Sequence, residues 1–145
     1  MKTSGSKGFH IVVPLDGKSK MGDVARFANA VGRVFVSHAP DHLTQEFAKA
    51  DRKGRIYVDT GRNGYSATFA AAYTVRAKPG APVSAPCTWE EIEKGKVAPT
   101  TFNLRNMPAR IKKAGDVWAD MLRKRPSLKK PIEKLKRVAS EPARP

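Results

Sequence analysis

The sequence is poor in the residues that several common classes of protein require. It contains one cysteine, Cys87, so it can form neither an internal disulfide bond nor a metal site built from several cysteines. No apolar run approaches the roughly 20 residues of a membrane-spanning helix, and none resembles the apolar core of a secretory signal. We therefore expect a cytoplasmic protein.

Acidic residues are also scarce in comparison with basic ones. The chain has 13 Asp and Glu against 28 Lys and Arg, and its formal net charge is +15. An excess of this size favours phosphate-rich partners such as nucleic acids. Basic residues are densest after residue 108, where a solvated tail that touches phosphates without specificity and a dedicated docking segment both explain the pattern. Charge therefore indicates a class of partner but no activity.

The hydrophobic pattern predicts one domain of the α/β (α+β) class. Residues 9–15, 43–47, 55–58 and 68–77 have the length and composition of short strands, and residues 21–36 repeat apolar side chains at helical spacing. A capping pattern at Thr88 and a proline at position 108 predict two further short helices. Alternation of strands and helices predicts an open mixed sheet with flanking helices.

Proline positions set the expected limits of regular structure. Three prolines in residues 78–86 predict an irregular arm on the surface. Prolines also interrupt the Lys-rich and Arg-rich segment past about Arg125, where we expect weak order. We therefore divide the chain into a domain over residues 1–120 and a basic, weakly ordered tail over residues 121–145.

A glycine-containing loop at residues 4–10 is a candidate anion site. Its sequence, Ser-Gly-Ser-Lys-Gly-Phe-His, surrounds a turn with hydroxyls, an ammonium and an imidazole, and backbone N–H groups at such turns can hold phosphate oxygens. The glycine spacing differs from that of a Walker loop, and a plain Gly-Ser turn next to a strand is the alternative. His10 likewise fits a structural histidine on a strand.

A second cluster places one carboxylate and two arginines near predicted strand ends. Asp59 follows an apolar strand, and Arg62 lies three residues further on. Strand ends are where open α/β sheets hold ligands, but Asp59 has no D-x-D or D-x-E partner nearby and also fits a simple cap of the strand. Arg76, on the next predicted strand, could reach the same phosphates as Arg62 if those strands pair, or could be a solvated strand arginine.

Taken together, three blocks in order resemble the primase-polymerase domain of bacterial DNA ligase D, within the archaeo-eukaryotic primase superfamily. The blocks are residues 4–10, residues 49–63 and residues 73–89, and the similarity spans roughly residues 2–120. The resemblance implies template-dependent nucleotidyl transfer at DNA ends during non-homologous end joining. It also implies a nucleoside triphosphate and DNA as partners, and Mg²⁺ or Mn²⁺ as cofactor.

The resemblance also implies roles for individual residues. Ser4 and His10, with Lys7 as a weaker candidate, match triphosphate-binding positions of the family. Asp59 matches its third metal ligand and is the candidate catalytic residue, whereas Arg62 and Arg76 match arginines that clamp phosphates. Thr60 and Gly61 replace the bulkier pair that usually follows the aspartate.

The departures from the family pattern lead to a more specific hypothesis. The paired aspartates and amino-terminal half of the family would precede Met1, so two of three metal-site carboxylates are missing. We expect a carboxy-terminal fragment, either a truncated product or half of a split enzyme whose partner chain supplies the aspartates, and we expect it to be inactive alone. The alternatives are a non-catalytic basic nucleic-acid-binding module on the same scaffold and a decayed product that barely folds.

Overall fold

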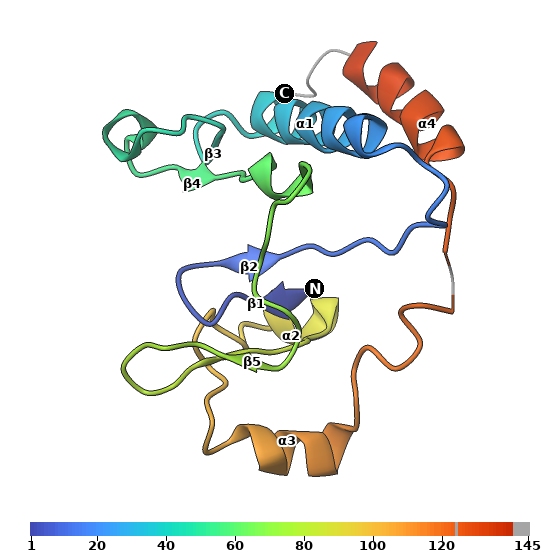
Figure 1. Ribbon diagram of the computed structural model, residues 1–145. Coiled ribbons are helices and arrows are strands. Elements are labelled where there is room, and N and C mark those ends of the chain that lie inside the picture. The colour runs from blue at the N-terminus through green and yellow to red at the C-terminus, as the bar shows by residue number, and fades with distance from the viewer. Residues whose placement is uncertain (124, 141–145) are drawn as a thin grey trace. The chain divides into compact units, whose positions relative to one another are not determined.

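The computed structural model describes residues 1–123 and 125–140 and confirms the α/β class (Figure 1). Its strands are β1 Lys2–Thr3, β2 Phe9–His10, β3 Leu43–Thr44, β4 Ile56–Tyr57, β5 Thr74–Val75 and β6 Val83–Ser84. Its helices are α1 Met21–His38, α2 Trp89–Glu93, α3 Met107–Ala114 and α4 Lys129–Ser140, with 3₁₀ turns η1 Lys49–Arg52 and η2 Gly61–Asn63. The strands form three two-stranded sheets, β1-β2, β3-β4 and β5-β6. The chain divides into two compact units: residues 1–14 with 69–125, and residues 15–68 with the segment that starts at Pro126.

The first unit joins the beginning of the chain to a segment far along the sequence. Strands β1 and β2 pair antiparallel with Lys2 opposite His10, and β5 and β6 also pair antiparallel. The backbone N–H of Thr3 donates to the carbonyl of Ala85 at 2.9 Å, and the N–H of Cys87 donates to the carbonyl of Met1 at 3.2 Å. The loop after β1 is thereby fixed against β6.

The core of the first unit lies around β6, in a segment that the sequence analysis placed on the surface. The buried residues are Val83, Ala85, Cys87, Val97, Phe102 and Met107. Pro82 and Pro86 are buried as well, so the expectation of a surface arm over residues 78–86 was wrong for its second half. Both prolines form isolated bridge pairs, while Val83 and Ala85, which lie between them, use their N–H groups. Proline can occupy such a strand because the missing donors fall at positions that need none.

Helices α2 and α3 pack in the same unit through an ion pair. Thr88 caps α2 with Glu91 in the predicted reciprocal capping box. The Arg110 guanidinium on α3 donates to the two carboxylate oxygens of Glu91 at 2.7 and 3.0 Å and lies 4.2 Å from the centre of the Phe102 ring. This planar contact ties the two helices to the core.

The second unit is built on α1, which begins at Met21 as expected and ends at His38. Strands β3 and β4 pair in parallel, with Leu43 opposite Ile56, and are shorter than the sequence pattern suggested. Gly32 of α1 is buried, and a Cβ atom built on it would lie 3.0 Å from Cδ of Gln45. This glycine lets the chain after β3 approach the helix closely. Figure 1 shows α4 lying alongside α1, and the two helices are in contact.

Regular structure continues past Arg125, where the sequence analysis expected weak order. Leu128 is buried, and Ile132 and Leu135 are half-buried, so apolar residues recur at helical spacing on the side of α4 that is not exposed. Pro131 lies in the first turn of this helix, where proline is tolerated because no intrahelical donor is lost. Residues 141–145 lie outside the described residues, and the domain boundary at residue 120 stays a prediction. Within the described ranges, no helix is long and apolar enough to cross a membrane.

Candidate functional site

Ser4 shapes the glycine-containing loop in the first unit. Its backbone N–H donates to the carbonyl of Gly8 at 2.9 Å, which closes the loop. Its hydroxyl oxygen accepts hydrogen bonds from the N–H groups of Ser6 and Gly8, both at 3.1 Å. The hydroxyl hydrogen of Ser4 remains a donor, so this side chain can both hold the turn and donate to an anion.

Gly5 brings Arg76 against the loop. Gly5 has φ of 62°, a conformation that favours glycine, and a Cβ atom built on it would lie 2.7 Å from Cγ of Arg76. The aliphatic part of the Arg76 side chain therefore lies directly over the glycine, just after strand β5. This close approach packs the Arg76 side chain against the turn that Ser4 closes.

A fully buried lysine lies next to His10. The Lys2 ammonium is 2.7 Å from Nδ1 of His10 and donates to the Ser84 hydroxyl at 2.5 Å. It also lies 5.4 Å from the centre of the Phe69 ring, whose plane is nearly perpendicular to that of His10. Burial first, and then the positive charge of Arg76, lower the pKa of Lys2 from 10.5 to about 8.

Further cations surround the loop. The Lys78 ammonium donates to the Ser6 hydroxyl at 2.6 Å, and Lys7 is an exposed residue of the loop itself. With Lys2 and Arg76, these side chains place several positive charges around exposed polar groups of one turn. Such an arrangement attracts an anion and can hold it by charge-assisted hydrogen bonds.

Asp59 and Arg62 lie in the second unit, at the carboxyl end of β4. The Asp59 carboxylate is exposed and accepts a hydrogen bond from the N–H of Gly61 at 3.0 Å, which starts η2. Arg62 lies exposed in that turn. No group of three or more His, Cys, Asp or Glu side chains that could hold a metal occurs in residues 1–123 or 125–140. Asp59 can supply one ligand, and the described residues do not fit a complete divalent-cation site.

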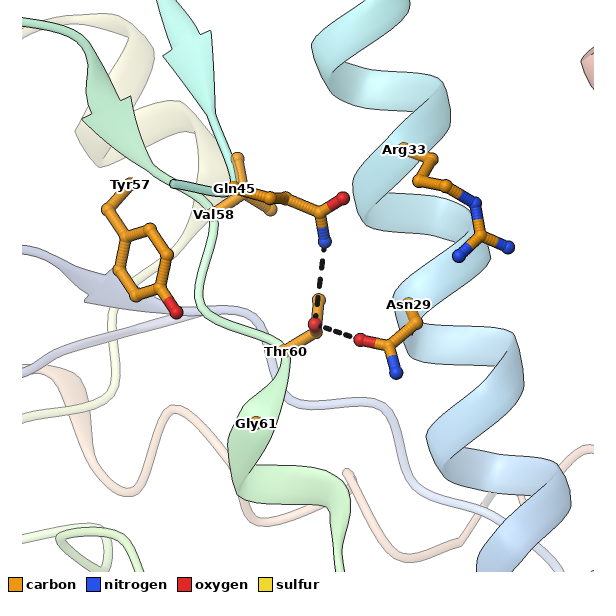
Figure 2. A pocket seen from close by; sticks show the side chains of 7 residues that line it. All are labelled: Asn29, Arg33, Gln45, Tyr57, Val58, Thr60 and Gly61. Carbon is orange, nitrogen blue, oxygen red and sulfur yellow. Dashed lines mark hydrogen bonds between the residues drawn. The ribbon is translucent and has the colours of Figure 1, made fainter. Parts of the chain in front are cut away.

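A polar pocket lies beside this strand end, between α1 and the β3-β4 pair (Figure 2). Its volume is about 370 Å³, and it is lined by Asn29, Arg33, Gln45, Tyr57, Val58, Thr60 and Gly61. The Thr60 hydroxyl donates to the Asn29 side chain and accepts from the Gln45 amide at 3.5 Å. Thr60, the residue after Asp59, thus anchors the end of β4 to helix α1.

Comparison with known proteins identifies the family. Residues 1–118 match the model of the LigD primase-polymerase domain. The chain belongs to this family. The LigD family takes part in non-homologous end joining, as the names of its members state.

Individual LigD relatives are larger than this chain. The multifunctional non-homologous end joining protein LigD of Pseudomonas aeruginosa is 39% identical over 122 residues, which cover 83% of this chain and 14% of that protein. The bifunctional LigD of Bacillus subtilis is 26% identical over 123 residues, or 20% of its length. The polymerase domain of Mycobacterium tuberculosis ligase D in complex with DNA has a TM-score of 0.77 and 29% identity, covering 86% of this chain and 43% of that one. This chain therefore spans less than half of the solved LigD polymerase domain.

The residues selected from the LigD resemblance fall into two groups. Ser4, Lys7, His10 and Arg76 belong to the first unit, whereas Asp59 and Arg62 belong to the second. Arg76 was expected to reach the same phosphates as Arg62 if their strands paired. The strands do not pair with each other, because β4 pairs with β3 and β5 pairs with β6. The assignment of these six residues to triphosphate and metal stays a prediction.

Sequence reasoning missed four residues next to the candidate site: Lys2, Phe69, Lys78 and Ser84. The sequence did contain a signal for Lys2, because this residue precedes the loop by two positions and an antiparallel hairpin places it opposite His10. Ser84 and Phe69 carried none, because only the tertiary fold brings residues so far along the chain to the loop.

Proposed function

We propose that this chain binds a nucleoside triphosphate and DNA as part of a LigD-type primase-polymerase that performs template-dependent nucleotidyl transfer at DNA ends. One observation carries the proposal. The loop closed by Ser4 holds the Ser4 hydroxyl in the same compact unit as His10 and Arg76, where a polyphosphate could contact all three.

The chemistry of the loop suits phosphate oxygens, of which a triphosphate offers several. Phosphate oxygens accept hydrogen bonds from backbone N–H groups, hydroxyls and guanidinium groups, and the loop offers each of these donors. Two cations lie at the turn: Lys7 is part of it, and Lys78 is bonded to Ser6. In this proposal Ser4, Lys7, His10 and Arg76, all in the first unit, contact the phosphates.

DNA binding is proposed on the basis of charge and of the solved relative. The net charge of +15 favours the phosphate backbone, and the relative from Mycobacterium tuberculosis was solved in complex with DNA. The contacts made by that protein are its own, and here we propose only the partner. DNA affinity is expected to fall steeply with salt because it depends on displaced counterions.

Nucleotide addition is proposed to require carboxylates that this sequence does not contain. Asp59 is the one strand-end carboxylate of the candidate site, and the sequence has no D-x-D pair. Transfer assisted by Mg²⁺ or Mn²⁺ needs several oxygen ligands. We therefore expect no detectable primer extension by residues 1–145 alone, and activity only where the further carboxylates are supplied.

Triphosphate binding tests the proposal. The full chain is titrated with a fluorescent ATP analogue, and the titration is repeated with Ser4→Ala, His10→Ala and Arg76→Ala. Each variant should weaken binding by about tenfold, the loss of one hydrogen bond to a charged group. Lys112→Ala on α3 is the control, because it removes an exposed positive charge from the same unit away from the loop.

Two results would overturn different parts of the proposal. Unchanged binding in all three loop variants would remove the triphosphate site. Primer extension with Mn²⁺ by the pure chain, abolished by Asp59→Ala, would instead disprove the requirement for outside carboxylates.

A second candidate is a non-catalytic nucleic-acid-binding module, which the charge of α4 favours. Lys129, Lys130, Lys134 and Lys136 of this helix are all exposed. If DNA binds the chain and the triphosphate does not, this second function replaces the first.

A further inference from the structure

We propose that Lys2 is a positioning residue that holds His10 as the neutral tautomer with its proton on Nε2. The link from this tautomer to triphosphate binding rests on the proposed function, whereas the tautomer itself can be measured without any nucleotide. The tautomer is set by a hydrogen-bond network of four residues: Lys2, Thr3, His10 and Ser84.

Three members of the network are buried, and His10 is half-buried. Lys2, Thr3 and Ser84 have side chains fully removed from solvent. The Lys2 Nζ atom lies 2.7 Å from Nδ1 of His10 and 2.5 Å from Oγ of Ser84. Water therefore has no access to Lys2, and its hydrogen bonds must be made within the protein.

The direction of each hydrogen bond follows from the groups present. The hydroxyl of Ser84 has one proton, and it donates that proton to the carbonyl of Thr3 at 2.8 Å. Oγ of Ser84 must then accept from Lys2. An ammonium has three donors and no acceptor, so Nδ1 of His10 must accept as well. A histidine whose Nδ1 accepts and which stays neutral carries its proton on Nε2.

Strand register and an aromatic contact fix the position of the ring. Lys2 and His10 are directly opposite in the β1-β2 pair, so the backbone holds the two side chains on the same face. The Phe69 ring meets the His10 ring edge to face at 5.9 Å and also lies under the Lys2 ammonium. The imidazole is thus held at Nδ1 and at its side, which sets where Nε2 points.

The tautomer decides what His10 can do at the loop. With the proton on Nε2, the far nitrogen of the ring is a hydrogen-bond donor, which is the polarity that a phosphate oxygen requires. With the proton on Nδ1, the same nitrogen would be an acceptor and would repel that oxygen. Lys2 therefore acts on an anion through His10 without contacting it.

Nitrogen NMR of the full chain with labelled histidine tests the tautomer directly. At pH 7 the His10 signals should show a pyridine-like Nδ1 and a pyrrole-like Nε2, and Lys2→Met should convert them to a mixture of the two neutral tautomers. Lys112→Met should leave them unchanged, because it removes a lysine charge from the same unit without touching His10. A wild-type spectrum with the proton on Nδ1, or with a doubly protonated ring, would overturn the proposal even if Lys2→Met failed to fold.

A pH titration of the wild-type chain gives a second readout. Above the Lys2 pKa of about 8, the neutral amine has a lone pair and can accept from Nδ1, so the tautomer ratio should change with an inflection there. Arg76 and His10 are the charged and titratable groups that act on Lys2. A tautomer ratio that stays constant through this range would show that Lys2 does not control it.

Triphosphate titration separates the two proposals. Lys2→Met should weaken binding of the ATP analogue by about tenfold, as expected when a donor to a charged group is lost. If NMR confirms the tautomer and His10→Ala leaves binding unchanged, the phosphate role of His10 fails and the positioning role of Lys2 stands. If His10→Ala weakens binding and NMR shows the other tautomer, the phosphate role of His10 stands and the positioning role of Lys2 fails.

Discussion

Gly5 lies so close to Arg76 that the arginine side chain occupies the space where any other residue would place its Cβ atom. Gly5→Ala would combine this clash with a φ of 62°, which disfavours alanine. We expect a loss of about 1–2 kcal/mol in the free energy of unfolding, together with weaker triphosphate binding as Arg76 is displaced. Urea unfolding and the ATP-analogue titration measure the two effects.

The matched control for Gly5→Ala is Gly8→Ala in the same loop. No atom lies within 4 Å of a Cβ built on Gly8, and its φ is outside the left-handed region. The stability of this variant should stay within about 0.5 kcal/mol of the wild type. Equal losses in both variants would mean that the contact with Arg76 does not explain the requirement for glycine at position 5.

Stability should rise with pH between about 8 and 10.5 because of Lys2. Burial lowers the pKa of Lys2 to about 8 in the folded chain, whereas its ordinary value is 10.5, so the unfolded chain binds more protons in this interval. Stability increases with pH wherever the unfolded state binds more protons. The experiment compares urea unfolding of the wild type and Lys2→Met across this range. The wild type should gain stability relative to Lys2→Met as the pH rises, and a constant difference would exclude a depressed Lys2 pKa.

The ion pair between Arg110 and Glu91 should make the stability of the chain depend on pH in the acid range. Hydrogen bonds from Arg110 hold the pKa of Glu91 below its usual value of 4.5, so the stabilisation is present above that value and is lost as pH falls through the lower folded pKa. Glu91→Gln should flatten the fall in stability at acid pH and cost about 2 kcal/mol at pH 7. Thermal unfolding as a function of pH measures both effects.

Glu90→Gln provides the comparison for this ion pair. Glu90 pairs with Lys94 on the same short helix, and both side chains are largely exposed. Exposed pairs contribute about 0–1 kcal/mol, so this variant should keep the wild-type acid profile. If Glu90→Gln and Glu91→Gln changed the acid profile equally, the ion pair between α2 and α3 would contribute no more to stability than an exposed pair.

The exposed lysines of α4 should account for part of the salt dependence of DNA binding. Replacing Lys129, Lys130, Lys134 and Lys136 with Gln should reduce the slope of log affinity against log salt by about 0.9 for each phosphate that these lysines neutralise. Fluorescence anisotropy with duplex DNA at several salt concentrations measures the slope. A control with Lys94, Lys96, Lys112 and Lys113 replaced removes the same charge from the first unit. Equal slopes in the two variants would show that net charge alone, and not α4, sets the dependence.

Local patterns in the sequence were sufficient for several elements. The spacing of apolar residues predicted α1, and Thr88 with Glu91 predicted the start of α2, because both signals act within a few residues. The family could also be recognised, since the three motif blocks are short and ordered along the chain. The same reasoning failed for α4, because its prolines and charges are typical of a solvated tail although Leu128, Ile132 and Leu135 lie at helical spacing.

The sequence by itself determined the charge, the family and the glycine-containing loop of this protein. Composition is enough for the charge, and short motifs of neighbouring residues are enough for the other two. Only the tertiary structure decided that Ser84 joins Lys2 beside His10 and that Arg76 covers Gly5. It also decided that the proline-containing segment around β6 is buried, in pairing with β1. These relationships join residues some 80 positions apart, as in the contact of Thr3 with Val83. Such contacts depend on which distant strands pair, and no local propensity records that choice.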